Sequence, residues 1–241
     1  MIAQSVFITS MSDIASIKLK INEKIFVRDP EQTELGRKII KQSIDLIDEV
    51  GFEKFTFKKL AERIHSTEAS VYRYFENKHK LLIYLANWYW SWLEYQVNYQ
   101  IHNIENPEKR LRVALRVIAG VSELSEEFQH IDKQALYRII MVELPKASHT
   151  KEVDADNRDG FFKSYKSLCK CVAVMVQEVD STYQFPHTLV SMCLESVHQQ
   201  IFFSKHLPSL TDLKIINGNY EPMAIYLEDL VFRVLRPSSV R

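Results

Sequence analysis

Residues 56–82 gather side chains that suit one kind of chemistry, hydrogen bonding to phosphates and to the polar edges of bases. Hydroxyl groups and backbone amides at helix N-termini bind phosphates, whereas an arginine can reach a base edge. Side chains of this kind in the stretch include the hydroxyls of Thr67, Ser70 and Tyr72, the guanidinium of Arg73 and the ammonium of Lys78.

Two short helices joined by a tight turn are predicted to position these side chains. Thr56 is a suitable N-cap for the first helix, whose apolar residues recur at helical spacing at Phe57, Leu60, Ala61 and Ile64. His65 and Ser66 then break the helix, and Thr67 can cap a second one that runs to about Phe75.

The second helix is predicted to bury Val71 and Phe75 and to turn the polar and aromatic residues between Glu68 and Tyr74 wholly or partly outward. A short helix, a turn and a second helix with a compact polar face form the helix-turn-helix arrangement, whose second helix fits a DNA major groove. Asn77 can cap a third helix, so Lys78 would lie in its first turn beside a flanking phosphate.

The run from Leu35 to Leu82 resembles the N-terminal domain of the TetR/AcrR family of one-component transcriptional regulators. The matching features are Gly51, the run from Thr56 to Ala61, Thr67, the VYRYF run at 71–75, and Asn77-Lys78 followed by Leu81-Leu82. The resemblance implies phosphate contacts from Thr56, Thr67, Tyr72 and Lys78. It also implies that the residues facing the bases are Glu68, Ala69, Ser70, Arg73 and Tyr74.

Two positions depart from the family pattern, because His65 in the turn and Ala69 in the recognition helix stand where glycine is common. A histidine can adopt the required backbone conformation at some cost, and alanine adds only a methyl group, so both are compatible with binding. Between residues 52 and 80, seven Lys and Arg oppose four Asp and Glu, a net charge of +3. Because this attraction is modest, a homodimer that doubles the phosphate contacts is part of the predicted mechanism.

The composition predicts an all-α fold. Five Gly and seven Pro in 241 residues leave few turns for a many-stranded sheet. We expect an N-terminal arm or small β-hairpin at 1–30, a three-helix helix-turn-helix domain at 31–80, and a helical bundle for ligand binding and dimerisation at 81–241. The hairpin alternative comes from Ile17 to Ile21, where apolar residues alternate with lysines.

A long fourth helix from Asn77 to about Gln100 is predicted to place Tyr84, Trp88, Trp92, Tyr95 and Tyr99 on one face. Such a stripe is either core or, in part, the lining of an apolar cavity that orients a small ligand. A sixth helix, predicted from Phe128 to about Leu144, adds further apolar surface. The candidate ligand-binding residues are Trp88, Trp92, Tyr95 and Tyr137.

The last two helices are predicted over Pro186–His206 and Pro222–Leu235, and their apolar stripes are either internal core or an interface. In the family that the chain resembles, this pair packs against its copy as a four-helix dimer interface. Effector binding to the C-terminal domain usually changes the separation of the recognition helices. The resemblance therefore implies double-stranded operator DNA, a small apolar or amphipathic effector and a second copy of the chain as partners.

Other functions find little support in the sequence. No phosphate-binding glycine loop, nucleophile elbow or zincin motif occurs, so we expect no enzyme, cofactor or metal. The Glu195 and His198 pair has the spacing of a di-iron ligand pair but lacks a second copy. Without a signal peptide or a long uncharged stretch, a cytoplasmic protein with no membrane partner is expected. The alternative to a ligand-responsive repressor is a dimeric ligand-binding or scaffold protein with a vestigial DNA-binding head.

Overall fold

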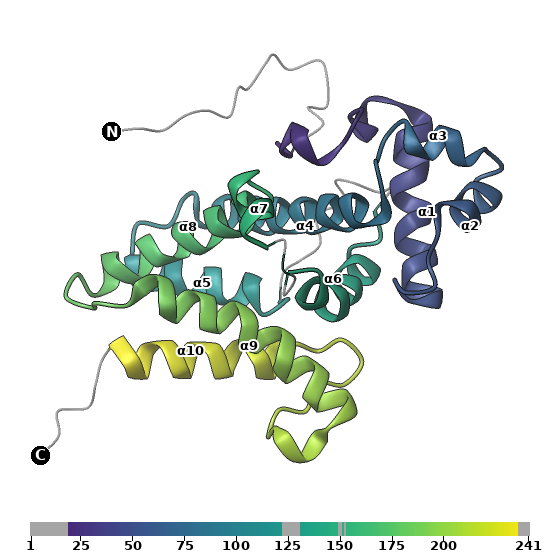
Figure 1. Cartoon of the computed structure of the whole chain (residues 1–241). Helices are drawn as coiled ribbons and strands as arrows, with labels where there is room; N and C mark the ends of the chain where they lie inside the picture. Colours follow the sequence, from purple (N-terminus) through teal and green to yellow (C-terminus); the bar gives the residue numbers. More distant parts are fainter. Residues whose placement is uncertain (1–18, 122–130, 149–150, 152, 236–241) are drawn as a thin grey trace, which may run out of the picture.

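The computed structural model describes residues 19–121, 131–148, 151 and 153–235. Every regular element in this part of the chain is helical, which confirms the all-α class (Figure 1). The elements are η1 (Glu23–Ile25), η2 (Pro30–Gln32), α1 (Glu34–Val50), α2 (Phe57–Arg63), α3 (Glu68–Tyr72), α4 (Lys78–Ile101), α5 (Pro107–Ile118), α6 (Lys133–Ser148), α7 (Val153–Arg158), α8 (Lys163–Val179), α9 (Pro186–His206), η3 (Pro208–Leu210) and α10 (Glu221–Leu235).

Helices α1 to α3 form a small head at one end of the molecule (Figure 1). Thr33 caps α1 by accepting a hydrogen bond from the Gly36 amide, and Gly51, with φ of 79°, ends it. The head is held together by buried side chains that the helical spacing predicted, among them Ile40, Leu60 and Phe75. The second helix of the motif is shorter than expected, because α3 ends at Tyr72 rather than near Phe75.

The hairpin alternative for the N-terminal segment is wrong for the described residues 19–29. The Asn22 side chain accepts a hydrogen bond from the Lys24 amide and starts the 3₁₀ turn η1, which buries Ile25. A hairpin would need two strands here, and residues 19–29 contain the turn η1 instead. We therefore describe residues 19–29 as an arm. Residues 1–18, including the first two residues of the alternating stretch 17–21, lie outside the described part.

Helix α4 is the centre of the helical body and contacts α5, α6 and α8, while α9 and α10 lie on the far side of α5 and α8 (Figure 1). Asn77 caps α4 as predicted, accepting from the Lys80 amide. Its aromatic stripe is largely core: Tyr84, Trp88 and Trp92 are buried, and the Trp88 and Trp92 rings stack with centroids 6.4 Å apart. Among the described residues no helix combines the length and apolar character needed to cross a bilayer.

Two parts of the body differ from the prediction. Helix α6 begins at Lys133, because the Asp132 carboxylate accepts hydrogen bonds from the Gln134 and Ala135 amides, and it continues past Pro145. The stretch 147–159 is polar and charged, which predicts a solvated loop, but it contains α7, a short helix that has too few apolar residues to show a helical period. Phe128, the predicted start of α6, lies outside the described residues.

Candidate nucleic-acid interface

Two threonines build the helix-turn-helix by capping its helices. The Thr56 Oγ1 accepts a hydrogen bond from the Lys59 amide at 3.3 Å, and the Thr67 Oγ1 accepts one from the Ser70 amide at 3.2 Å. Both threonines are exposed. Because capping uses an oxygen lone pair, the hydroxyl of Thr56 keeps its hydrogen for a phosphate oxygen.

His65 gives the turn between α2 and α3 its shape. Its φ is 55°, in the left-handed region that favours glycine, as the sequence led us to expect. The Ser66 amide then donates to the Ala61 carbonyl at 2.9 Å, which satisfies a free carbonyl at the end of α2. The turn therefore forms with a histidine in place of glycine, at a cost of about 1–2 kcal/mol.

The outward face of α3 consists of Glu68, Ala69, Tyr72 and Arg73, all exposed. The Tyr72 ring packs edge-to-face on Phe57 with centroids 5.0 Å apart, so its hydroxyl is held at the surface. The Arg73 Nη2 donates to the Ser70 Oγ at 3.2 Å. Contacts within the head thus hold both the Tyr72 ring and the Arg73 guanidinium in place.

Two residues that we expected to face the bases point inward. Tyr74 is buried, because its hydroxyl hydrogen bonds to the Thr33 Oγ1 at 2.8 Å and its carbonyl accepts from the Val27 amide. Ser70 is also buried, with its hydroxyl between Thr67 and Arg73. Their side chains support the recognition helix from beneath, and the prediction that they face the bases is corrected accordingly.

The Lys78 ammonium is directed into the protein instead of outward to a flanking phosphate. It donates to the carbonyls of Phe52, Glu53 and Phe55 at 3.1, 3.2 and 3.3 Å, and lies 4.8 Å from the centroid of the Phe52 ring. These bonds use its three N–H groups and fix the turn that precedes Thr56. In this structure Lys78 therefore positions the motif, and a phosphate would have to displace one carbonyl.

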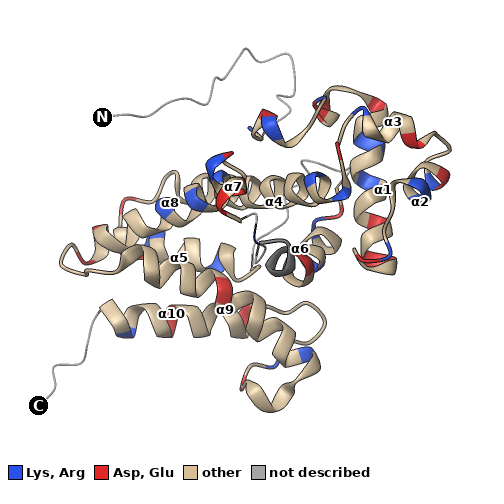
Figure 2. Ribbon diagram, in the orientation of Figure 1, with Lys and Arg blue, Asp and Glu red and all other residues tan. Residues whose placement is uncertain are grey.

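Three lysines that were not among the predicted contact residues lie exposed near the start of α2. Lys54, Lys58 and Lys59 flank Thr56 and are exposed, and basic residues are prominent on α2 in Figure 2. The helical period predicts Lys58 and Lys59 on the polar side of this helix, but it does not distinguish a phosphate contact from any other exposed lysine. Together with the Thr56 hydroxyl they form a surface that can hold the DNA backbone.

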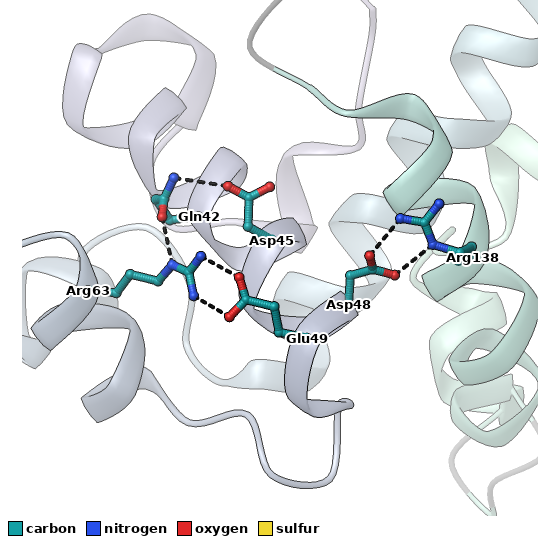
Figure 3. A network of polar contacts seen from close by, with 6 residues as sticks. All are labelled: Gln42, Asp45, Asp48, Glu49, Arg63 and Arg138. Carbon is teal, nitrogen blue, oxygen red and sulfur yellow. Dashed lines mark hydrogen bonds and ion pairs between the residues drawn. The ribbon is translucent and has the colours of Figure 1, made fainter.

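Arg63 is unavailable to that surface because it joins α2 to α1 (Figure 3). Its guanidinium makes two 2.6 Å hydrogen bonds to Glu49, which lower the pKa of that carboxyl, and its Nε donates to the Gln42 Oε1 at 2.8 Å. One residue before Glu49, Asp48 accepts two hydrogen bonds from Arg138 of α6, at 2.9 and 2.6 Å. The network therefore connects the head to the body.

A cavity of about 350 Å³ lies in the body between α4, α5 and α8. Its lining is mixed in polarity and comprises Glu94, Ile101, Arg110, Ser167, Lys170, Cys171, Val174, Met175 and Glu178. Burial raises the pKa of Glu94, and the Arg110 Nε is buried without a hydrogen-bond partner. None of the four predicted ligand-binding residues, Trp88, Trp92, Tyr95 or Tyr137, lines this cavity.

The four residues instead contribute mainly to packing. Periodicity identified their shared apolar character but could not separate core from cavity lining. The Trp92 Nε1 and the Tyr137 hydroxyl are nevertheless buried without hydrogen-bond partners. Since buried donors are normally paired, a ligand role for Trp92 and Tyr137 stays a prediction.

His198 on α9 makes the body sensitive to acid. Its ring packs beside Trp90 with centroids 5.6 Å apart, and burial lowers its pKa from 6.5 to about 4. Glu195, the other half of the di-iron spacing, accepts a hydrogen bond from the Tyr165 hydroxyl instead. The described residues contain no His, Cys, Asp and Glu cluster that could hold a metal ion.

We expect the protein to lose stability as the pH falls from 6.5 towards 4. In this window the unfolded state binds a proton at His198 that the folded state excludes, so at pH 5 the loss is roughly 2 kcal/mol. Urea unfolding at pH 7.5 and pH 5, at one protein concentration, measures it. His198→Gln should lose less over the same interval, and an equal loss in both proteins would assign the acid sensitivity to other groups.

Comparison with known proteins relates both the head and the fold to regulators. The family model described as "Bacterial regulatory proteins, tetR family" matches residues 39–85, and no curated protein matches the chain. Among solved structures, AibR in complex with isovaleryl coenzyme A and operator DNA is 20% identical, with a TM-score of 0.53; the match covers 83% of this chain and 98% of AibR.

Two further solved structures share the fold. The fatty acid degradation regulator FadR from Bacillus halodurans is 16% identical with a TM-score of 0.58, over 79% of this chain and 96% of that one. The TetR family transcriptional regulator PfmR from Thermus thermophilus is 11% identical with a TM-score of 0.54, over 84% and 99%. The head of the chain therefore matches the tetR family of bacterial regulatory proteins, and the chain shares its overall fold with the solved structures of these regulators.

Proposed function

We propose that the protein is a ligand-responsive transcriptional repressor that binds a palindromic operator as a homodimer in the cytoplasm. The observation that supports this best is the outward face of α3, where Tyr72 and Arg73 are exposed yet ordered by Phe57 and Ser70. In the proposed complex Glu68, Ala69 and Arg73 face the bases. Phosphates are held by Thr56, Thr67, Tyr72 and the exposed lysines of α2.

The proposed dimer is formed by α9 and α10. Both helices expose large apolar side chains, among them Met192, Phe202 and Ile225, which are 61%, 43% and 59% exposed. Figure 2 shows the visible face of α9 with few charged residues. Several large apolar side chains exposed on one pair of helices favour an interaction site there. A second copy would cover it and present two recognition helices to two operator half-sites.

The proposed effector is a small apolar or amphipathic molecule bound in the helical body. AibR, which shares the fold, was solved with both isovaleryl coenzyme A and operator DNA. An effector can release DNA only to the extent that it binds one spacing of the heads more tightly than the other. Helix α6 contacts the head directly. Its Arg138 donates hydrogen bonds to Asp48, and its Glu143 accepts one from the Phe52 amide.

An electrophoretic shift over a salt series, with the protein's own upstream DNA and a random duplex as competitor, tests DNA binding. The proposal requires preference for the upstream fragment at low salt without effector. A dimeric protein that prefers neither fragment would support the alternative, a ligand-binding or scaffold protein with a vestigial head. That alternative is favoured by the diversion of Arg63 and Lys78 to protein contacts.

Substitutions on the outward face of α3 separate base reading from backbone contact. Tyr72→Ala should weaken binding to all sequences by a similar factor, because a phosphate contact contains no sequence information. Arg73→Ala should weaken operator binding by roughly 1–3 kcal/mol and also relax sequence preference. Selection of bound sequences from a random pool measures both. An Arg73→Ala protein with unchanged preference would exclude this side chain as a base reader.

A further inference from the structure

The described N-terminal arm touches both the DNA-binding head and the start of α8. One end, at residues 27–28, meets the end of the recognition helix. The Val27 amide donates to the Tyr74 carbonyl at 2.9 Å, and the Arg28 guanidinium lies 5.7 Å from the centroid of the Tyr74 ring. Tyr74 is three residues after Val71, the buried anchor of α3, so this end of the arm fixes the C-terminal side of the recognition helix.

The middle of the arm is seated on α4. Ile25 is 1% exposed, and the Phe26 ring packs edge-to-face on Tyr84 with centroids 6.0 Å apart. Figure 1 shows this segment running over α4 towards α1 and α3. Burial of Ile25 alone is worth about 2 kcal/mol, so the middle of the arm holds firmly.

The other end is fastened to the loop between α7 and α8 by polar contacts at the surface. The Asn22 Nδ2 donates to the Asp159 carbonyl at 2.7 Å, and the Lys24 Nζ lies 3.0 Å from the Asp159 Oδ1. Gly160 adopts a φ of 81°, and a Cβ there would lie 3.1 Å from the Asn22 Nδ2. The close approach of Asn22 to this loop therefore depends on a glycine.

The same loop is tied to α4 and leads into α8. The Asn87 Nδ2 donates to the Phe161 carbonyl at 2.7 Å, and the Lys80 Nζ lies 3.8 Å from the centroid of the Phe161 ring. Residues 163–179 follow directly as α8, and six of its residues, from Ser167 to Glu178, line the body cavity. A displacement of α8 relative to α4 must therefore strain this loop or the contacts that hold it.

We infer that residues 22–28 are a strap through which the position of α8 acts on the recognition helix. The contacts at Asp159 form its releasable end, because the Lys24 and Asp159 side chains are 67% and 49% exposed and such pairs are weak. The middle of the strap, Ile25 and Phe26, stays packed on α4 and passes a displacement at Asp159 on to Val27 and Tyr74. The consequence for operator affinity rests on the proposed function, whereas the mechanical link does not.

Cutting the releasable end tests the strap in the full-length protein. The double variant Asn22→Ser/Lys24→Ala removes both side-chain contacts with Asp159, keeps at residue 22 a hydroxyl oxygen that can cap η1, and leaves every residue of α1 to α3 unchanged. We expect the Val27 amide, and the amides at 74–75, to exchange hydrogen about five- to tenfold faster, as expected for loss of one hydrogen bond and one exposed ion pair. Hydrogen-exchange mass spectrometry with a peptide covering 22–30 and one covering 68–76 measures both.

Lys20→Ala is the matched control, because Lys20 is an exposed arm lysine and the substitution removes the same charge. It should leave both peptides unchanged. The charge-swapped variant Lys24→Asp/Asp159→Lys keeps an opposite-charge pair at this contact, so its hydrogen exchange should lie closer to the wild-type rate than that of the double variant. Unchanged exchange at 74–75 in the double variant, or equal acceleration in the Lys20→Ala control, would overturn the strap.

Operator binding provides the separate functional readout. The double variant should bind the upstream fragment about three- to tenfold more weakly, with the salt dependence unchanged because no phosphate contact is removed. An unchanged affinity despite faster exchange would overturn the inferred action on DNA reading. If the wild-type protein binds no DNA at all, the proposed function fails, while the exchange experiment still decides whether the strap exists.

Discussion

Replacing Met192 and Phe202 with glutamate is expected to convert the proposed dimer into a monomer and to weaken operator binding at least 100-fold. Both side chains are exposed on α9, so in the isolated chain the new carboxylates remain in water and cost little stability. In a dimer the same carboxylates would be buried without partners, which is strongly unfavourable. Loss of the second head then removes the effective concentration that links two half-sites, typically worth 10²–10⁴ in affinity.

Sedimentation velocity gives the oligomeric state, and the electrophoretic shift gives the affinity at the same salt concentration. Tyr99→Glu is the matched control, because Tyr99 is 68% exposed on α4 and so is not on either helix of the proposed interface. It should remain dimeric and bind DNA normally. A wild-type protein that is monomeric at micromolar concentration, or a double variant that stays dimeric, would contradict an interface on α9.

Local interactions explain why much of the head could be predicted from sequence. The caps at Thr56, Thr67 and Asn77 act on amides three residues away, so the residue type and the following helical period were sufficient to locate them. His65 was recognised from the resemblance, because glycine is common at this position of the turn, and its φ is 55°. Such features need no knowledge of the tertiary structure.

The errors come from contacts between residues far apart in the sequence. The Tyr74 side chain faces inward because its hydroxyl hydrogen bonds to the Thr33 Oγ1, 41 residues earlier in the sequence. The Lys78 ammonium donates its hydrogen bonds to carbonyls that lie 23 to 26 residues earlier in the sequence. A helical period assigns a residue to a side of its own helix, but it does not show which neighbouring segment covers that side.

The same limit applies to the body. A stripe at four-residue spacing has identical appearance whether it packs against helices or borders a cavity, and the Trp88 and Trp92 pair proved to be core. The cavity lining between α4, α5 and α8 mixes acidic, basic and apolar residues, so no sequence pattern marked it. The coupling of body to head is equally non-local, since Arg138 meets Asp48 across 90 residues.

Gly36→Ala is expected to destabilise the protein by about 3 kcal/mol, the opposite of the usual effect. Within a helix, alanine normally stabilises by about 1 kcal/mol relative to glycine. Gly36 lies in the first turn of α1, where a Cβ would come within 2.1 Å of the Pro30 carbonyl oxygen and 2.6 Å of its Cα. These are backbone atoms of η2, so the clash can be relieved only by moving η2 away from α1.

Gly218→Ala is the matched control, since Gly218 has a φ of 73° and nothing within 4 Å of the added Cβ. It should cost only the left-handed backbone strain, about 1 kcal/mol. Urea unfolding at one protein concentration compares the two variants with wild type. Because η2 connects the strap to α1, Gly36→Ala should also displace Arg28 from Tyr74. A Gly36→Ala protein as stable as wild type would show that η2 is free to move away from α1.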